Sequence, residues 1–220
     1  TSGIRGPVGE VGTADLALSV GRALGIDTDR VVVGRDPRDS GRFLADALAA
    51  GLRESGTDVV RLGLAATPTI ARSVAWRDAD AGVSVTASHN PPEDNGLKLW
   101  QPSGQAFDAP LRETITDRIE SEAFDPAAWD EVGESSCWDS RDRHLEALLD
   151  AVSVERELSA VVDVGNGAGG LTADVLLELG CDVQTLNAQP DGAFPGRPSE
   201  PTAENCATLC DVVRDSEADL

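Results

Sequence analysis

Short apolar runs alternate with helix-periodic segments along the first half of this chain, and that alternation restricts the folds open to it. Val31-Val32-Val33 has the pattern of a buried strand, and the stretch after Ser40 carries the apolar helix stripe Phe43, Leu44, Ala47, Leu48 and Leu52. Further strands are predicted at residues 58–62, 82–86 and 95–100, and further helices at 14–24, after a cap at Thr67, and at 111–119. Because strands and helices follow each other in turn, the sequence predicts an α/β sandwich with a largely parallel sheet.

The alternation is interrupted between Glu122 and Ser136, which lack a clear period, and we expect a domain boundary there. The expected domains cover residues 1–135 and 136–220. In the second domain, strands are predicted at residues 160–164 and 181–186, and helices at 139–152, 171–179 and 203–216. The predicted fold is therefore α/β, with two successive α/β sandwich domains that contain mostly parallel, mixed sheets.

The loop after the predicted strand at 82–86 holds the residues best suited to chemistry. Thr86-Ala87-Ser88-His89-Asn90-Pro91 follows this strand directly, and ligands of α/β sheets gather beyond the carboxyl ends of the strands. A serine in such a turn is in most proteins only a hydrogen-bonding turn residue. Here prolines stiffen the loop, His89 and Asn90 can donate hydrogen bonds, and Lys98 follows ten residues after Ser88. Phosphoryl transfer needs an oxygen nucleophile with cationic groups around it, so Ser88 is the candidate phosphoryl carrier.

Lys98 is the only lysine of the chain, since 17 of the 18 basic residues are arginines. Lysine can exchange its proton as a general acid or base, whereas arginine stays protonated, so Lys98 is a candidate for proton transfer. The structural alternative is a side chain that lies along an exposed strand. A serine hydrolase is not indicated, because no G-x-S-x-G motif surrounds Ser88 and the only histidines are His89 and His144.

The chain carries 39 acidic and 18 basic residues, a formal net charge of -21. Such a field repels nucleic acids and anionic membranes, so neither is an expected partner, and no apolar run is long enough to span a membrane. An acidic surface is most simply a solvated one. Its sharper interpretation is adaptation to high salt, with a melting temperature that falls as salt is removed. An anionic ligand would need a locally positive pocket within this field.

Two further features have structural interpretations. Cys206, Leu209, Cys210 and Val213 recur with helical spacing, so we expect both cysteines in a core rather than on a metal, and a reducing cytoplasm fits them. The segment from Gly165 to Gly170 formally matches the dinucleotide motif G-x-G-x-x-G after a strand, but Asn187 stands where an acidic residue is wanted. A close-packed strand-to-helix turn is the better interpretation, and a nucleotide-binding α/β module is kept as an alternative.

Several segments, in this order along the chain, resemble the α-D-phosphohexomutases, the family of phosphoglucomutase and phosphomannomutase. They are Thr1 to Gly6 (TSGIRG), Gly34 to Arg38 (GRDPR), Thr86 to Pro91 (TASHNP), Asn95 to Lys98 (NGLK), Val162 to Gly169 and Phe194 to Arg197. The resemblance implies an isomerase that interconverts hexose 1-phosphate and hexose 6-phosphate through a phosphoserine and a bisphosphorylated sugar. It implies Ser88 as the phosphoryl carrier, His89 and Asn90 beside it, Lys98 in proton transfer and Arg5 holding charge in the cleft.

The resemblance also implies a phosphorylated hexose as substrate, a glucose 1,6-bisphosphate-type activator, and Mg²⁺ bound to a phosphate oxygen on Ser88. The family's other metal ligands come from a D-G-D-x-D-R loop, which this sequence lacks and which the resemblance would place just past Leu220. We therefore expect domain I and an incomplete domain II of a four-domain family, inactive and weak in magnesium binding on its own. A phosphoglucosamine mutase of the same family and a non-catalytic relative are the alternatives.

Overall fold

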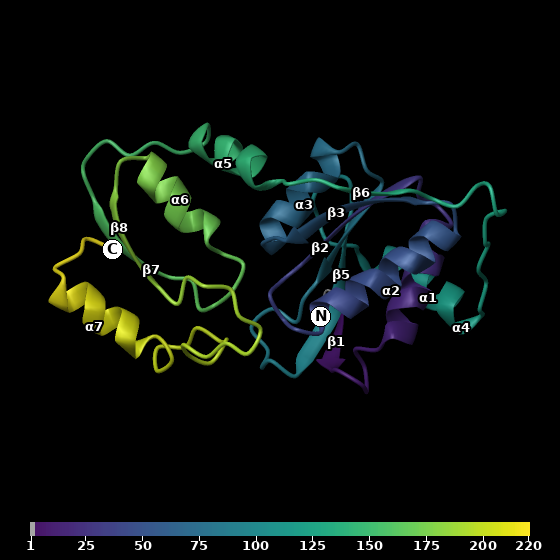
Figure 1. Ribbon diagram of the computed structural model, residues 1–220, viewed down its shortest axis with the longest axis horizontal. Coiled ribbons are helices and arrows are strands. Elements are labelled where there is room, and N and C mark those ends of the chain that lie inside the picture. The colour runs from purple at the N-terminus through teal and green to yellow at the C-terminus, as the bar shows by residue number, and fades with distance from the viewer. Residues whose placement is uncertain (1–2) are drawn as a thin grey trace. The chain divides into compact units, whose positions relative to one another are not determined.

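The computed structural model describes residues 3–220; Thr1 and Ser2, with which the TSGIRG segment begins, lie outside the described residues. Two compact units make up the described chain (Figure 1). Unit 1 comprises the residues through Ser88 together with Glu93–Asp139, and unit 2 comprises His89–Pro92 and Ser140–Leu220. Helices pack on a sheet in each unit, so the predicted class of two α/β domains is confirmed. Over residues 3–220, no helix combines the length and the apolar character that crossing a membrane requires.

A six-stranded sheet with the order β1-β5-β4-β2-β3-β6 forms the centre of unit 1. Its strands are β1 (Ile4–Pro7), β2 (Arg30–Arg35), β3 (Asp58–Leu64), β4 (Ala81–Val85), β5 (Asp94–Trp100) and β6 (Ser135–Cys137). Neighbours from β4 through β2 and β3 to β6 run parallel, whereas β5 is antiparallel to both β4 and β1. The sheet is mixed and mainly parallel, and β6 extends unit 1 beyond Ser135. No sequence pattern predicted β6, because Ser135, Ser136 and Cys137 form no apolar run; all three are exposed.

Four helices cover the two faces of this sheet: α1 (Ala14–Gly25), α2 (Gly41–Glu54), α3 (Thr67–Trp76) and α4 (Ala109–Glu120). One buried cluster joins α1, α2 and α4 to the sheet through residues such as Leu24, Leu48 and Ile115. A second cluster, around Ile70 and Val74, packs α3 against the opposite face (Figure 1). Since both faces are covered, the ends of the strands are where this unit can present polar groups to a ligand.

Two local predictions about these helices turn out differently, whereas Thr13 does cap α1, accepting from the Leu16 N–H at 3.2 Å. Thr67 is the first residue of α3 and not its cap; Ala66 is the N-cap, and Pro68 lies in the first turn. Ser40 stands at the N-cap position of α2, but its side chain makes no capping hydrogen bond, and its hydroxyl accepts from the Asn95 side chain at 2.8 Å. Phe43 is 43% exposed and does not belong to the buried stripe of α2.

Unit 2 contains a parallel pair of strands, β7 (Ser159–Asp163) and β8 (Asp182–Leu186), with helices α5 (Arg141–Leu149), α6 (Leu171–Glu178) and α7 (Ala207–Asp215). Helix α6 packs on β8 and on α5, and α7 packs on β7 (Figure 1). The predicted core position of Cys206 and Cys210 is wrong: Cys210, in α7, is exposed, Cys206, the N-cap of α7, is only half-buried, and both are free thiols. The sheet under α7 has only two strands in the described part of the chain, so the helix buries none of its residues completely.

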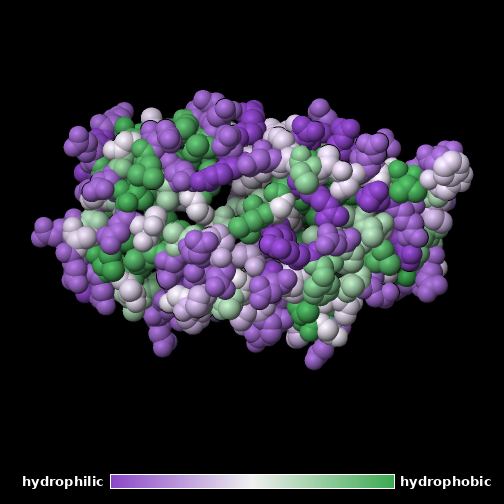
Figure 2. Space-filling view, viewed as in Figure 1, coloured by the Kyte–Doolittle hydropathy of each residue, from purple (hydrophilic) through white to green (hydrophobic). Residues whose placement is uncertain are grey.

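Hydrophilic side chains cover much of the face drawn in Figure 2, with hydrophobic ones scattered between them. This surface agrees with a chain in which acidic residues outnumber basic ones two to one, 39 against 18. Most aspartates and glutamates among residues 3–220 are exposed, as the simpler interpretation of the composition requires.

Candidate active site

Ser88 lies just beyond the carboxyl end of β4, exposed to solvent, and its backbone is held in an unusual conformation. Its φ angle is 61°, in the left-handed region that residues other than glycine seldom occupy. Such a conformation persists where the surroundings over-determine it, and it is enriched at functional sites. The local backbone therefore marks Ser88 independently of its sequence motif.

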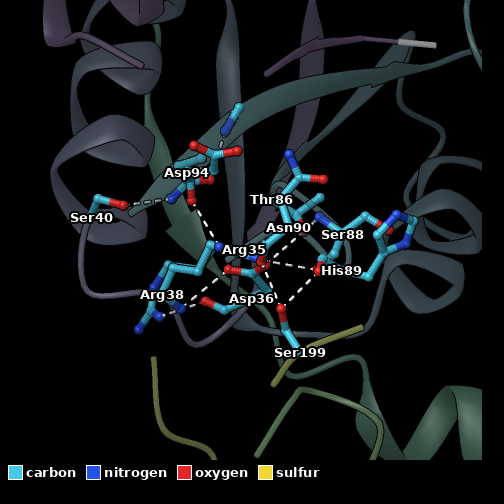
Figure 3. Close-up of polar contacts among 12 residues, drawn as sticks. Arg35, Asp36, Arg38, Ser40, Thr86, Ser88, His89, Asn90, Asp94 and Ser199 are labelled. Carbon is cyan, nitrogen blue, oxygen red and sulfur yellow. Dashed lines mark hydrogen bonds and ion pairs between the residues drawn. The ribbon is translucent and has the colours of Figure 1, made fainter. Parts of the chain in front are cut away.

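A short chain of hydrogen bonds holds Ser88 in that conformation from both sides (Figure 3). The Ser88 N–H donates to the Thr86 hydroxyl at 2.9 Å, and that hydroxyl donates to Oδ2 of Asp36 at 2.6 Å. The Ser88 carbonyl oxygen accepts from Nη2 of Arg38 at 3.0 Å. Both peptide groups of Ser88 are thus tied to the pair formed by Asp36 and Arg38.

Arg38 is the buried cation at the centre of this hydrogen-bond network. Its side chain is fully buried; Nε contacts Oδ2 of Asp36 at 3.1 Å, and Nη1 donates to the carbonyl oxygen of Asp94 at 2.8 Å. Buried charges are tolerated where they are paired and hydrogen-bonded, and this guanidinium is both. Neither Asp36 nor Arg38 was among the predicted site residues, although both lie in the GRDPR segment. One feature of the sequence could have pointed to them: an acidic and a basic residue stand two positions apart, directly after a buried strand.

Ser88, Lys98 and Arg5 line one pocket of about 250 Å³. Its described lining consists of Gly3, Ile4, Arg5, Thr86, Ala87, Ser88, Leu97 and Lys98. Of the five predicted site residues, the structure therefore brings three together in unit 1. His89 and Asn90 belong to unit 2 and are not part of this lining.

Strand pairing explains why Arg5 and Lys98 meet. Arg5 lies opposite Gly96 in the β1–β5 pair, and Gly96 and Lys98 are two residues apart, so all three positions lie on one face of the sheet. Gly96 permits the close approach of β1, since a Cβ on it would lie 2.0 Å from the carbonyl oxygen of Ile4. Glycine at position 96 thus allows β1, the strand that carries Arg5, to lie beside Lys98.

The described lining of the pocket holds two cations and no carboxylate. In a chain of net charge -21, this is the locally positive site that an anionic ligand requires.

The described residues form no metal site of their own. No three His, Cys, Asp or Glu side chains within residues 3–220 gather closely enough to hold a metal ion, so the residues around Ser88 do not by themselves form a Mg²⁺ site.

His89 and Asn90 are held through their backbones in unit 2. The Ser199 hydroxyl lies 2.7 Å from the carbonyl oxygen of His89 and 2.8 Å from that of Asn90, so its single proton is shared between the two (Figure 3). The carbonyl oxygens of the segment are therefore fixed by a hydroxyl from the loop that follows β8.

A second polar network closes the glycine-rich turn after β7. The Asp163 side chain is only 4% exposed, and it accepts from Nε of Arg197 at 2.5 Å, from the Asn187 amide at 2.9 Å and from the Gly165 N–H at 2.9 Å. Burial raises the pKa of Asp163, but these hydrogen bonds together outweigh it and leave that pKa below its ordinary value.

Arg197 also fills the space beside Gly165. The φ of Gly165 is 58°, and a Cβ on it would lie 2.5 Å from Nη2 of Arg197. The turn is thus packed against the chain's own guanidinium, which favours the structural interpretation of the G-x-G-x-x-G match over a dinucleotide site.

Comparison with known proteins agrees with this geometry. Residues 1–126 match the family described as phosphoglucomutase/phosphomannomutase, alpha/beta/alpha domain I, and residues 142–220 match domain II of the same family. The chain is 45% identical to a probable phosphoglucosamine mutase of Methanococcoides burtonii, over 100% of this chain and 51% of the relative. It is 42% identical to a phosphoglucomutase/phosphomannomutase of Thermococcus kodakarensis, again over 100% of this chain and 51% of the relative.

Among solved structures, a phosphoglucomutase/phosphomannomutase family protein from Burkholderia thailandensis aligns with a TM-score of 0.87 at 34% identity, covering 99% of this chain and 50% of that one. A putative phosphomannomutase from Thermus thermophilus aligns with a TM-score of 0.83 at 28% identity, covering 97% of this chain and 51% of that one. The fold and the two matched domains define a phosphohexomutase-type α/β protein. The chain belongs to the phosphoglucomutase/phosphomannomutase family, and it spans about half the length of the relatives it matches.

Proposed function

We propose that the protein is a phosphohexomutase in which Ser88 carries the phosphoryl group that moves between the 1- and 6-positions of a hexose phosphate. The observation that carries this proposal is the pocket in which an exposed serine, clamped at a positive φ, faces the same space as Lys98 and Arg5. Membership of the phosphoglucomutase/phosphomannomutase family supports it.

In the proposed reaction a sugar hydroxyl attacks the phosphorus of phosphorylated Ser88. The bond from phosphorus to Oγ of Ser88 breaks as the bond to the sugar oxygen forms. Lys98 gives a proton to the departing serine oxygen and takes up the proton of the attacking hydroxyl, so the protons balance. Arg5 holds the phosphate of the substrate against the pocket wall. The second half of the reaction runs these steps in reverse at the other end of a bisphosphorylated sugar.

The proposed substrate is a phosphorylated hexose, and the names of the relatives indicate which to test first. Most are called probable phosphoglucosamine mutases, and the Thermococcus kodakarensis relative is called a phosphoglucomutase/phosphomannomutase. Glucosamine phosphate should therefore be assayed beside glucose and mannose phosphates. We also propose a cytoplasmic enzyme adapted to high salt: the free cysteines fit a reducing compartment, and the acidity fits high salt.

Mg²⁺ would bind a phosphate oxygen on Ser88 and neutralise charge during transfer. The described residues do not supply its other ligands. For the same reason we propose that residues 1–220 alone bind magnesium weakly and do not convert hexose phosphate.

Intact mass after incubation with glucose 1,6-bisphosphate tests the proposal, with the protein at its full natural length. One added phosphoryl group is expected, and Ser88→Ala should abolish it. Ser103→Ala is the matched control, because Ser103 is an exposed turn serine outside the pocket. A protein that stays unmodified and converts no hexose phosphate would rule out the mutase and leave the non-catalytic relative.

A further inference from the structure

Lys98 has an aromatic neighbour that its role as an acid and base does not by itself explain. Its Nζ lies 4.5 Å from the centroid of the Trp100 ring. The two residues are two positions apart on β5, so both side chains lie on the same face of the sheet. This distance falls within the range in which an ammonium group is attracted to the negative face of an indole.

The Trp100 ring is itself fixed. It is only 7% exposed, and its Nε1–H donates to the hydroxyl of Ser84 at 2.8 Å, a residue that is fully buried. Ser84 lies directly opposite Lys98 in the β4–β5 pair, and Gly82 lies opposite Trp100. A small residue and a glycine on β4 thus leave room for the indole beneath the lysine side chain. The ring is a rigid platform rather than an adaptable contact.

Lys98 has no carboxylate partner among residues 3–220, although the chain carries 39 acidic residues. A carboxylate would orient the ammonium but would also neutralise it and compete with an anionic ligand. An indole face attracts the cation and leaves its three N–H donors available. Orientation without neutralisation is what a pocket for a phosphosugar needs.

We propose that Trp100 is a positioning residue for Lys98: its indole face holds the ammonium against the Ser88 pocket while leaving the positive charge and the proton donors free. The catalytic consequence rests on the proposed phosphohexomutase function. The contact itself does not, so the two can be tested separately.

The contact is measured by NMR on this chain, in which Lys98 is the only lysine. Biosynthetic labelling with [ε-¹³C]lysine gives a single lysine signal, and the ring current of Trp100 should move its protons upfield of free lysine. Trp100→Leu should return the signal to the free position, whereas Trp129→Leu should leave it unchanged, because Trp129 is 90% exposed. A wild-type signal at the free-lysine position would overturn the proposal.

The role is measured by kinetics on the protein at its full natural length. Fluorinated tryptophan analogues can be placed at position 100. Each added ring fluorine makes the face of the indole less negative and changes the shape of the ring very little. We expect kcat to fall stepwise along this series with little change in KM for the hexose phosphate. Trp100→Leu should lose roughly fivefold to thirtyfold in kcat, and Trp100→Phe should recover part of that loss. The analogues also keep the test valid if Trp100→Leu fails to fold.

A double-mutant cycle separates positioning from packing. If Trp100 acts through Lys98, Trp100→Leu should lower kcat no further in a Lys98→Ala background. A flat fluorine series, or an equal loss in both backgrounds, would overturn the positioning role. If the wild-type protein turns over no hexose phosphate, the proposed function fails and this role fails with it, while the NMR result still reports whether the contact exists.

Discussion

Replacing Arg38 by methionine should destabilise unit 1 and loosen the Ser88 loop. The guanidinium is fully buried and donates to the Asp36 carboxylate and to the carbonyl oxygens of Asp94 and Ser88. Methionine is unbranched and fills much of the same space, but it leaves the Asp36 side chain, which is only 15% exposed, without its ion-pair partner. Breaking a buried pair by removing one partner costs about 3–5 kcal/mol, and because Asp36 keeps some contact with water we expect about 3 kcal/mol.

Tryptophan fluorescence during a urea titration measures this loss in the right part of the molecule. The four tryptophans, at positions 76, 100, 129 and 138, all lie in unit 1. Urea is uncharged, so the salt concentration can stay high and constant. The matched control is Arg61→Met, which breaks an exposed pair with Asp46 and should cost less than about 1 kcal/mol. If Arg38→Met costs no more than this control, the Asp36–Arg38 pair does not hold the loop.

The double variant Asp36→Asn/Arg38→Met identifies the cause of the loss. It removes the unpaired carboxylate, so unit 1 should recover about 1–2 kcal/mol relative to Arg38→Met alone. Phosphorylation of Ser88 should be slower than in the wild type in both variants, because both lack the Arg38 bond to the Ser88 carbonyl oxygen. Additive losses in the cycle would show that the stability effect comes from packing rather than from charge.

Three further predictions concern Gly96, Asp163 and the net charge of the chain. Gly96→Ala should lower turnover at least tenfold, because its Cβ would lie 2.0 Å from the Ile4 carbonyl oxygen and displace the Arg5 strand; wild-type activity would contradict this. Asp163 has a depressed pKa in the folded state, so its stabilisation of unit 2 is present above about pH 4 and lost on acidification below that value. Asp163→Asn should lower the protection of the β7 amides from exchange at pH 7 and make that protection less dependent on pH below about pH 4. A protection profile that falls on acidification as in the wild type would contradict this. The melting temperature should fall as salt is removed, and equal values at low and multimolar salt would exclude salt adaptation.

The strands and the place of the Ser88 loop could be predicted from the sequence because they depend on local patterns. Val31-Val32-Val33 is an apolar run, and residues 82–86 contain Val83 and Val85 at alternate positions; both segments correspond to buried strands of the sheet. A loop after such a strand must lie at the carboxyl edge, where the structure places Ser88. Lys98 stood out because it is the only lysine, and it does line the pocket with Ser88.

The features that could not be predicted from the sequence depend on contacts between segments that are far apart along the chain. In the sequence, Asp36 and Arg38 look like ordinary surface charges. Only their hydrogen bonds with Thr86 and Ser88, some fifty residues away, show that they hold the Ser88 loop in place. The Ser40 hydroxyl accepts from Asn95 on β5, a contact that nothing near Ser40 in the sequence indicates. Cys210 had the spacing of a core residue, but spacing shows only which residues share a face of a helix, and not whether that face is covered.

The distances in the site also bear on how it could work in strong salt. At 1 M salt the screening length is about 3 Å, so long-range attraction between a phosphosugar and the pocket cations would be largely lost. Hydrogen bonds of 2.6–3.0 Å around Ser88 and a cation–π contact of 4.5 Å at Lys98 act at short range and in partly buried surroundings, where screening is weaker. Only Arg5 and Lys98 carry charge in the described lining; Arg38 lies outside it and is paired with Asp36. Tight positioning of two cations, rather than a broad positive field, is thus the arrangement that could bind an anion both in strong salt and in a protein of net charge -21.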